Sequence, residues 1–233
     1  MEFGKDFMLQ LTQSALAAMI DHTLLKAEAT RQEVDRLCQE AIQYNFASVC
    51  VHPFRVAQAT DILRDGPVKV CTVVGFPLGA NRAEVKALET VRAVADGARE
   101  IDMVMNIGAL KDGNLAAVEN DIRGVVTAAQ GHLVKVILET CLLTEDEIRR
   151  ACELSVKAGA RFVKTSTGFS SAGAKVEHVR WMRDTVGKVF GVKASGGIRD
   201  RETLLAMIEA GANRIGTSSG VALIEGIAAG GGY

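Results

Sequence analysis

The chain has 233 residues, of which 48% are hydrophobic and only 5% aromatic, and its net charge is −1 at pH 7. This near neutrality gives no electrostatic reason to expect nucleic acid or an anionic membrane as a partner. The sequence has no apolar run long enough to span a bilayer. Residues 8–20, which we expect to form a short leading helix, lack the basic flank of a signal peptide.

The five cysteines are widely spaced, odd in number and without a C-x-x-C pair. This usage argues against a disulfide framework or a structural zinc site and predicts a reducing, cytoplasmic location. The four histidines are isolated from one another. We therefore expect no metal site and no cofactor.

Short apolar segments alternate with helical patterns along the whole chain. Helical starts are marked by two capping boxes, Thr30 with Glu33 and Thr144 with Glu147. The alternation predicts a single-domain (β/α)8 TIM barrel over residues 1–233. An open doubly wound sheet is the main alternative, disfavoured because no G-x-G-x-x-G follows the first strand. The eight predicted strands are residues 19–24, 48–51, 69–74, 100–105, 134–139, 162–165, 189–194 and 214–216.

A helix-to-strand junction occurs three times, each time with a Gly-Ala pair that ends a helical pattern. Asp102, Lys164 and Gly216 each follow the junction glycine by five residues, on predicted strands four, six and eight. Alternate strands of a barrel contribute to the same interior layer. We therefore expect Asp102 and Lys164 to face each other, with Gly216 leaving room beside them.

Lys164 closes an apolar run and is followed at once by Thr165-Ser166-Thr167-Gly168. In a barrel this arrangement predicts an amine at the rim of a dry interior, because active sites lie at the carboxyl ends of the strands. Burial is expected to lower the pKa of such a lysine and to favour the nucleophilic neutral amine. The alternative is a lysine that merely ends a strand and points to solvent.

Lys193 ends the neighbouring predicted strand, so a second positive charge is expected beside Lys164. That charge is expected to lower the pKa of Lys164 further, and Asp102 is available for proton transfer and for pairing with the lysine that stays charged. A buried structural ion pair between lysine and aspartate is the alternative.

The last two loops have the composition of a phosphate site. Gly196 and Gly197 permit close approach of the backbone, and Ser218 and Ser219 are expected to open the final helix. Loops seven and eight hold phosphate in many barrels of this type. Ordinary turns are the alternative explanation for each segment alone.

Taken in order, these segments resemble the deoxyribose-phosphate aldolase family over nearly the whole chain, from about residue 20 to residue 219. The motifs that carry the resemblance are Asp21-His22-Thr23, Val49-Cys50, Glu100-Ile101-Asp102, Val163 to Gly168, Lys193 to Gly197 and Gly216 to Ser219.

The resemblance implies a class I aldolase that reversibly cleaves 2-deoxy-D-ribose 5-phosphate to D-glyceraldehyde 3-phosphate and acetaldehyde. It implies that Lys164 forms the Schiff base, that Lys193 tunes it and that Asp102 shares in proton transfer. It also implies a substrate border of Asp21, Thr23, Cys50 and Thr167, and a phosphate site of Gly168, Gly196, Gly197, Ser218 and Ser219.

Two other functions remain open from the residues alone: a sugar-phosphate isomerase, and a barrel that binds a phosphorylated sugar without catalysis. Family members are often dimers or tetramers, so the resemblance also implies a homo-oligomer. The Gly-rich tail, residues 228–233, is expected to be mobile. Its last residue, Tyr233, has a counterpart on the mobile tail of some family members, and its role stays open.

Overall fold

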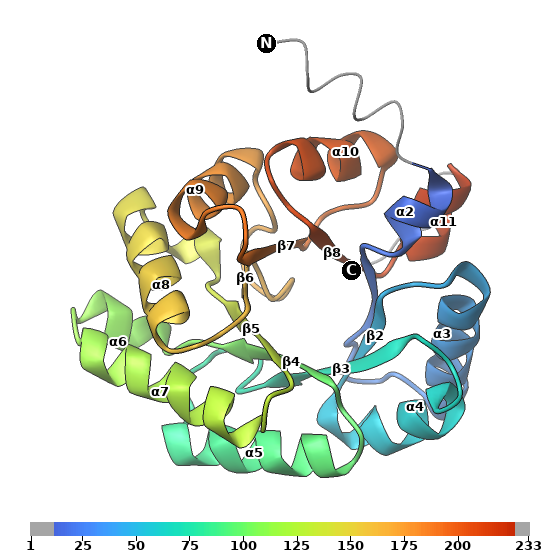
Figure 1. The fold of residues 1–233 in the computed structure, drawn as a ribbon, viewed down its shortest axis with the longest axis horizontal. Coiled ribbons are helices and arrows are strands. Elements are labelled where there is room, and N and C mark those ends of the chain that lie inside the picture. The colour runs from blue at the N-terminus through green and yellow to red at the C-terminus, as the bar shows by residue number, and fades with distance from the viewer. Residues whose placement is uncertain (1–11, 227–233) are drawn as a thin grey trace.

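The structure is a computed structural model that describes residues 12–226. Eight parallel strands pair in sequence order and close into a barrel, with β1 hydrogen-bonded to both β2 and β8. Figure 1 looks down this barrel and shows the strands as a central ring inside a ring of helices. The predicted TIM barrel is confirmed. The strands are β1 Ile20–Leu24, β2 Ser48–Val51, β3 Lys69–Val74, β4 Glu100–Val104, β5 Leu133–Ile137, β6 Phe162–Lys164, β7 Gly191–Ser195 and β8 Arg214–Thr217.

Helices fill the segments between the strands and cover the outside of the barrel (Figure 1). No helix in the described part of the chain has the length and apolar character that crossing a membrane requires. The helices are α2 Gln13–Ala17, α3 Arg31–Tyr44, α4 Val56–Leu63, α5 Ala83–Ala95, α6 Ile107–Lys111, α7 Leu115–Ala128, α8 Glu145–Lys157, α9 Val176–Val186, α10 Arg201–Glu209 and α11 Gly220–Glu225, with short 3-10 turns at Pro53–Arg55 and Thr140–Leu142.

Local sequence signals explain where several helices begin and end. Both predicted capping boxes form, at Thr30 before α3 and at Thr144 before α8, and such a cap contributes about 1 kcal/mol. The junction glycines Gly97, Gly159 and Gly211 all have positive φ, which is the backbone conformation that ends a helix and that glycine adopts without strain. The recurring junction therefore positions the strand that follows it.

The leading helix is shorter than its predicted span of residues 8–20. It ends at Ala17, and Ile20 already begins β1. Residues 8–11, the predicted mobile tail and Tyr233 lie outside the described residues. Predicted strand seven also shifts, because Val189 is fully exposed and β7 begins only at Gly191.

The strand residues alternate between an apolar layer and a polar interior. On β4, Ile101 and Met103 belong to the main apolar core, whereas Glu100 and Asp102 are buried charged residues. This period of two is the geometry of a strand, whose successive side chains point to opposite faces. Each Val, Ile or Leu side chain of this core contributes about 1.5–3 kcal/mol to the stability of the fold on full burial. The apolar layer between strands and helices therefore offsets the cost of burying charged residues inside the barrel.

Candidate active site

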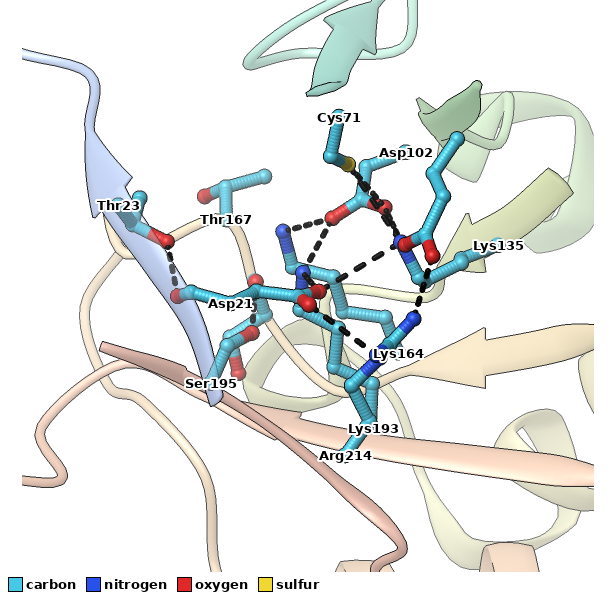
Figure 2. A network of polar contacts seen from close by, with 12 residues as sticks. Asp21, Thr23, Cys71, Asp102, Lys135, Lys164, Thr167, Lys193, Ser195 and Arg214 are labelled. Atoms are coloured by element: carbon cyan, nitrogen blue, oxygen red, sulfur yellow. Dashed lines mark hydrogen bonds and ion pairs between the residues drawn. The ribbon is translucent and has the colours of Figure 1, made fainter. Parts of the chain in front are cut away.

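Asp102 lies at the centre of the barrel among the side-chain nitrogens of three lysines (Figure 2). Its Oδ2 accepts from Lys164 Nζ at 2.8 Å and from Lys193 Nζ at 2.7 Å. Its Oδ1 accepts from Lys135 Nζ at 2.9 Å. Asp102, Lys135 and Lys193 are fully buried, and Lys164 is 3% exposed. The predicted pairing of Asp102 with Lys164 is therefore present, and both predicted catalytic lysines share one oxygen.

A second layer of charges lies next to this group. Lys193 Nζ lies 2.5 Å from Asp21 Oδ2, and Lys135 Nζ lies 2.5 Å from Glu100 Oε2. Arg214 joins the two carboxylates, with Nε 3.2 Å from Asp21 Oδ1 and Nη2 2.5 Å from Glu100 Oε1. We call these seven residues the ionic cluster: Asp21, Glu100, Asp102, Lys135, Lys164, Lys193 and Arg214.

The charges of the cluster dominate its proton equilibria. Burial alone would raise the pKa of Asp102, but the surrounding lysines hold it well below its usual range. Asp21 behaves in the same way beside Lys135, Lys193 and Arg214. Burial alone would lower the pKa of Lys193, yet Asp102 and Asp21 raise it above its usual value. Lys193 is therefore an ammonium and the two aspartates are carboxylates at neutral pH.

The register of the sheet explains why the two lysines meet. Lys164 on β6 pairs with Lys193 on the adjacent β7, so their side chains leave the sheet at one height on the same face. Gly216 on β8 provides the space for Lys193, because a Cβ at Gly216 would lie 2.9 Å from Lys193 Cε. This confirms the room that the junction spacing predicts at Gly216.

An open cavity lies above the ionic cluster at the carboxyl ends of the strands. Lys164 is the one member of the cluster that lines it. The cavity has a polar wall from β6, β7 and β8 and their loops, with Leu25 and Ile198 as its apolar members. Its residues are Thr23, Leu25, Lys164, Thr167, Gly168, Ser195, Gly196, Gly197, Ile198, Arg199, Gly216, Thr217 and Ser218.

The loops after β6 and β7 touch through their backbones at one side of the cavity. A Cβ at Gly173 would lie 2.1 Å from the carbonyl oxygen of Gly196, so only glycine fits there. Ala174 N–H donates to the same carbonyl at 3.0 Å. Gly196 itself has φ +85°. The shape of this wall is therefore set by main-chain atoms.

Five predicted site residues are absent from the cavity lining: Asp102 and Lys193, described above in the ionic cluster, and Asp21, Cys50 and Ser219. Asp21 lies in the ionic cluster, where its side chain also accepts from Ser48 Oγ at 2.7 Å. Cys50 packs in a small apolar cluster with Leu25, Cys71 and Val73 inside the barrel. Ser219 is the residue before α11, and its N–H donates to Thr217 Oγ1 at 3.0 Å. The other seven predicted residues line the cavity.

Sequence reasoning assigned no site role to three cations, Lys135 and Arg214 of the ionic cluster and Arg199. Arg199 lines the cavity two residues after the Gly196-Gly197 pair, where a basic residue in a glycine loop is a signal for anion binding. Arg214 and its partner Glu100 stand at the starts of their strands. Nothing in the sequence marks them as partners, because they meet only when the barrel closes.

Two groups of buried carboxylates and thiols have ligand atoms close enough for a metal ion, but their carboxylates are already paired with cationic side chains. Cys50, Cys71 and Asp102 offer ligand atoms close to one another, and so do Asp21, Cys71 and Glu100. However, the oxygens of all three acids already contact lysine or arginine nitrogens, and burial raises the pKa of the Cys71 thiol well above its usual value. A cation in either group would face these positive charges at short range.

Comparison with known proteins identifies the family to which the chain belongs. The family described as DeoC/LacD family aldolase matches residues 15–230. The deoxyribose-phosphate aldolase of Exiguobacterium sibiricum is 65% identical over 212 residues, which cover 91% of this chain and 96% of that protein. That of a Geobacillus species is 61% identical and is covered completely, over 95% of this chain.

Among solved structures, the tetrameric deoxyribose phosphate aldolase of Aeropyrum pernix superposes with a TM-score of 0.87 at 35% identity, covering 95% of this chain and 96% of that one. Barrel, buried lysines and sequence agree. The chain belongs to the DeoC/LacD family of aldolases and is a carbon–carbon lyase.

Proposed function

We propose that the protein reversibly cleaves 2-deoxy-D-ribose 5-phosphate to D-glyceraldehyde 3-phosphate and acetaldehyde, through a Schiff base on Lys164. The names of the relatives support this substrate. One observation carries the mechanism: among the lysines of the ionic cluster, Lys164 alone lines the cavity.

The ionic cluster surrounds Lys164 with equal numbers of positive and negative side chains. Lys135, Lys193 and Arg214 provide three positive charges, and Asp21, Glu100 and Asp102 provide three negative ones. Lys164 is the member of this set that reaches the cavity, where an amine can act as a nucleophile toward a carbonyl.

In the proposed reaction, Lys164 Nζ adds to C1 of the open-chain sugar and water leaves, which gives an iminium. Removal of the proton from the C3 hydroxyl then breaks the C2–C3 bond, releases D-glyceraldehyde 3-phosphate and sends the bonding electrons into an enamine. Protonation at C2 and hydrolysis release acetaldehyde and regenerate the amine. Asp102 and Lys193, 2.7 Å apart, are the groups that move these protons, with water as carrier.

We place the phosphate at the β6, β7 and β8 loops. Gly168, Gly196, Gly197 and Ser218 line the cavity there, and Arg199 adds a positive charge. Charged donors of this kind bind phosphate strongly. Thr23 and Thr167 line the same cavity and are proposed contacts of the sugar. The roles of Asp21 and Cys50 at the substrate border, and of Ser219 at the phosphate, stay predictions.

Trapping the Schiff base tests the proposal. The protein is incubated with 2-deoxy-D-ribose 5-phosphate, reduced with borohydride and mapped by mass spectrometry. We expect one adduct, on Lys164, and neither adduct nor turnover in Lys164→Leu. Lys157→Leu is the matched control, because Lys157 is an exposed lysine that pairs with Glu119 at the surface. An isomerase predicts retained activity in Lys164→Arg, and a non-catalytic binder predicts no turnover at all. Turnover without an adduct on any lysine contradicts the Schiff-base mechanism.

We also propose that the protein is a single aldolase domain that forms a homo-oligomer in the cytoplasm. The tetrameric relative from Aeropyrum pernix and three exposed apolar residues of α5, Val85, Leu88 and Val91, support assembly. The five cysteines, all free thiols, support a reducing compartment. Light scattering after size exclusion measures the mass: a dimer or tetramer supports assembly, and a mass near 25 kDa, that of one 24.8 kDa chain, contradicts it.

A further inference from the structure

Glu139 has an unusual backbone conformation at the mouth of the barrel. It follows the end of β5 by two residues, with φ 57° and ψ 60°, and it is buried at 2% exposure. A residue with a side chain is uncommon in this left-handed region, and such conformations persist where the surroundings hold them in place.

The backbone around Glu139 holds the segment that contains Lys164. Leu138 N–H donates to the carbonyl of Lys164 at 2.9 Å, and Thr140 N–H donates to the carbonyl of Thr165 at 2.9 Å. Between these two bonds, the Glu139 side chain reaches Thr167. One short stretch after β5 thus fixes successive points along the β6 loop, from the reactive lysine to the cavity wall.

The Glu139 carboxylate receives hydrogen bonds from three donors. Thr167 N–H donates to Oε1 at 3.2 Å, the Thr167 hydroxyl donates to Oε2, and the Cys141 thiol lies 4.0 Å from Oε1. Burial raises the pKa of Glu139, and the two bonds from Thr167 oppose that rise. An ionised carboxylate can only accept hydrogen bonds, so it determines which way the hydrogen of the Thr167 hydroxyl points.

The same hydroxyl oxygen accepts the N–H of Phe169 at 3.0 Å. A hydroxyl has one donor hydrogen and two lone pairs. With its hydrogen held by Glu139 and one lone pair held by Phe169, Thr167 has one lone pair left. Thr167 lines the cavity together with Lys164, whereas the lining residues do not include Glu139. Glu139 therefore acts on the ligand only through Thr167.

We propose that Glu139 is a positioning residue that fixes the Thr167 hydroxyl as a hydrogen-bond acceptor, so that the site selects a phosphorylated aldehyde whose own hydroxyl donates to it. The proposal rests on the aldolase activity proposed above and specifies which acceptor the enzyme prefers. A site built to bond a substrate hydroxyl discriminates strongly against the analogue that lacks it, because the protein group is left unpaired.

The test measures acceptor preference in the direction of carbon–carbon bond formation, with acetaldehyde as donor, at pH 8. The two acceptors are D-glyceraldehyde 3-phosphate and 3-phosphooxypropanal, which differ only in the 2-hydroxyl. We expect the wild type to prefer the hydroxyl-bearing acceptor in kcat/KM by about tenfold or more. We expect Glu139→Gln, which keeps the size but can donate its amide hydrogens, to lose most of that preference.

Thr167→Val is expected to lose the same preference, and the double variant Glu139→Gln/Thr167→Val to lose no more than Thr167→Val alone. Thr167→Ser, which retains the hydroxyl, is expected to keep the preference. Glu153→Gln is the matched control, since Glu153 is an exposed residue of α8 that lies 3.8 Å from Arg150. A loop that is merely loosened slows both acceptors equally and leaves their ratio intact.

An unchanged ratio in Glu139→Gln, or an equal loss with both acceptors, overturns the proposal. If Glu139→Gln does not fold, Glu139→Asp, which withdraws the carboxylate from Thr167 by one carbon, is expected to lose the preference and takes its place. Failure of the underlying activity has a different signature, because the wild type then gives neither aldol product nor a Lys164 adduct. That result overturns both proposals.

Discussion

Lys164 on β6 and Lys193 on β7 donate to the same oxygen, Oδ2 of Asp102, at 2.8 Å and 2.7 Å. Asp102 thus holds the two lysine nitrogens side by side in the barrel interior. Lys193 has a second carboxylate, Asp21, at 2.5 Å, whereas Lys164 has the cavity on its open side. The asymmetry distinguishes Lys164, the proposed nucleophile, from its charged neighbour.

Asp102→Asn removes the negative charge but keeps the size of the side chain. We expect kcat to fall by about 10²–10⁴-fold, the usual contribution of a positioned proton-transfer group. Urea unfolding is also expected to show a loss of about 3–5 kcal/mol, because three lysines lose a buried partner. Asp65→Asn, at an exposed position, is the control. A kcat within twofold of wild type contradicts the role of Asp102.

Gly216→Ala tests the space that Lys193 needs. The added Cβ would lie 2.9 Å from Lys193 Cε and 3.0 Å from Ser195 Cβ, so Lys193 must move away from Asp102. We expect kcat to fall about tenfold or more from misplacement, with a cost of about 1–3 kcal/mol in the free energy of unfolding.

The matched control is Gly124→Ala in the interior of α7, where no atom lies within 4 Å of the added Cβ. This change is expected to stabilise the protein by about 0.5–1 kcal/mol and to leave kcat unchanged. Equal kinetics in the two variants contradict the packing argument at Gly216.

Acid stability depends on the carboxylates whose pKa the cluster lowers. Asp21 and Asp102 have lower pKa values folded than unfolded. Their contribution to stability is therefore complete above the unfolded value of about 3.9 and is lost as the pH falls below it. Circular dichroism is expected to show a flat plateau from neutral pH down to about pH 4.5, followed by acid unfolding. Asp121 and Glu139, whose pKa values burial raises, oppose this trend.

Arg214→Met removes one of the cations that hold the pKa of Asp21 down. We expect the acid-unfolding midpoint to move to higher pH. Arg150→Met is the control, because Arg150 is 56% exposed and its nearest carboxylate is 3.8 Å away. A midpoint that stays the same in Arg214→Met shows that Arg214 does not lower this pKa.

A second buried pair supports the outer face of the barrel. Lys86 of α5 donates to Asp121 of α7 at 2.6 Å and to the carbonyl of Val104 at 2.9 Å, with its side chain fully buried. Lys86→Met alone is expected to cost about 3–5 kcal/mol by leaving Asp121 without its partner. Lys86→Met/Asp121→Leu is expected to recover part of that loss in urea unfolding. Additive effects of the two substitutions contradict a direct pairing.

Much of the fold is predictable from local signals. The bounds of β2 and β3 are those that the sequence predicts, because turn-forming residues flank both runs, Asn45 and Pro53 around β2 and Pro67 and Gly75 around β3. The repeated junction also predicts correctly that Asp102 meets Lys164. Strand seven is predicted two residues early, since Val189 and Phe190 are apolar and only the burial of the folded chain shows that Val189 is outside the sheet.

The ionic cluster is less predictable for a physical reason. A period of two places Glu100 and Asp102 on one face of a strand but does not say which face is inward. Arg214 reaches Asp21 only because β8 pairs with β1, which brings the last strand of the chain beside the first. Glu139 is missed as a positioning residue because its backbone leaves the strand pattern at positive φ, which no propensity predicts for glutamate.

The contact between Gly173 and the Gly196 carbonyl limits how this catalyst can be redesigned. A wall of main-chain atoms has no side chain to shorten. Single substitutions there therefore do not widen the cavity for bulkier aldehydes. Room for unnatural substrates must come from trimming Leu25 and Ile198, whose side chains border the same cavity.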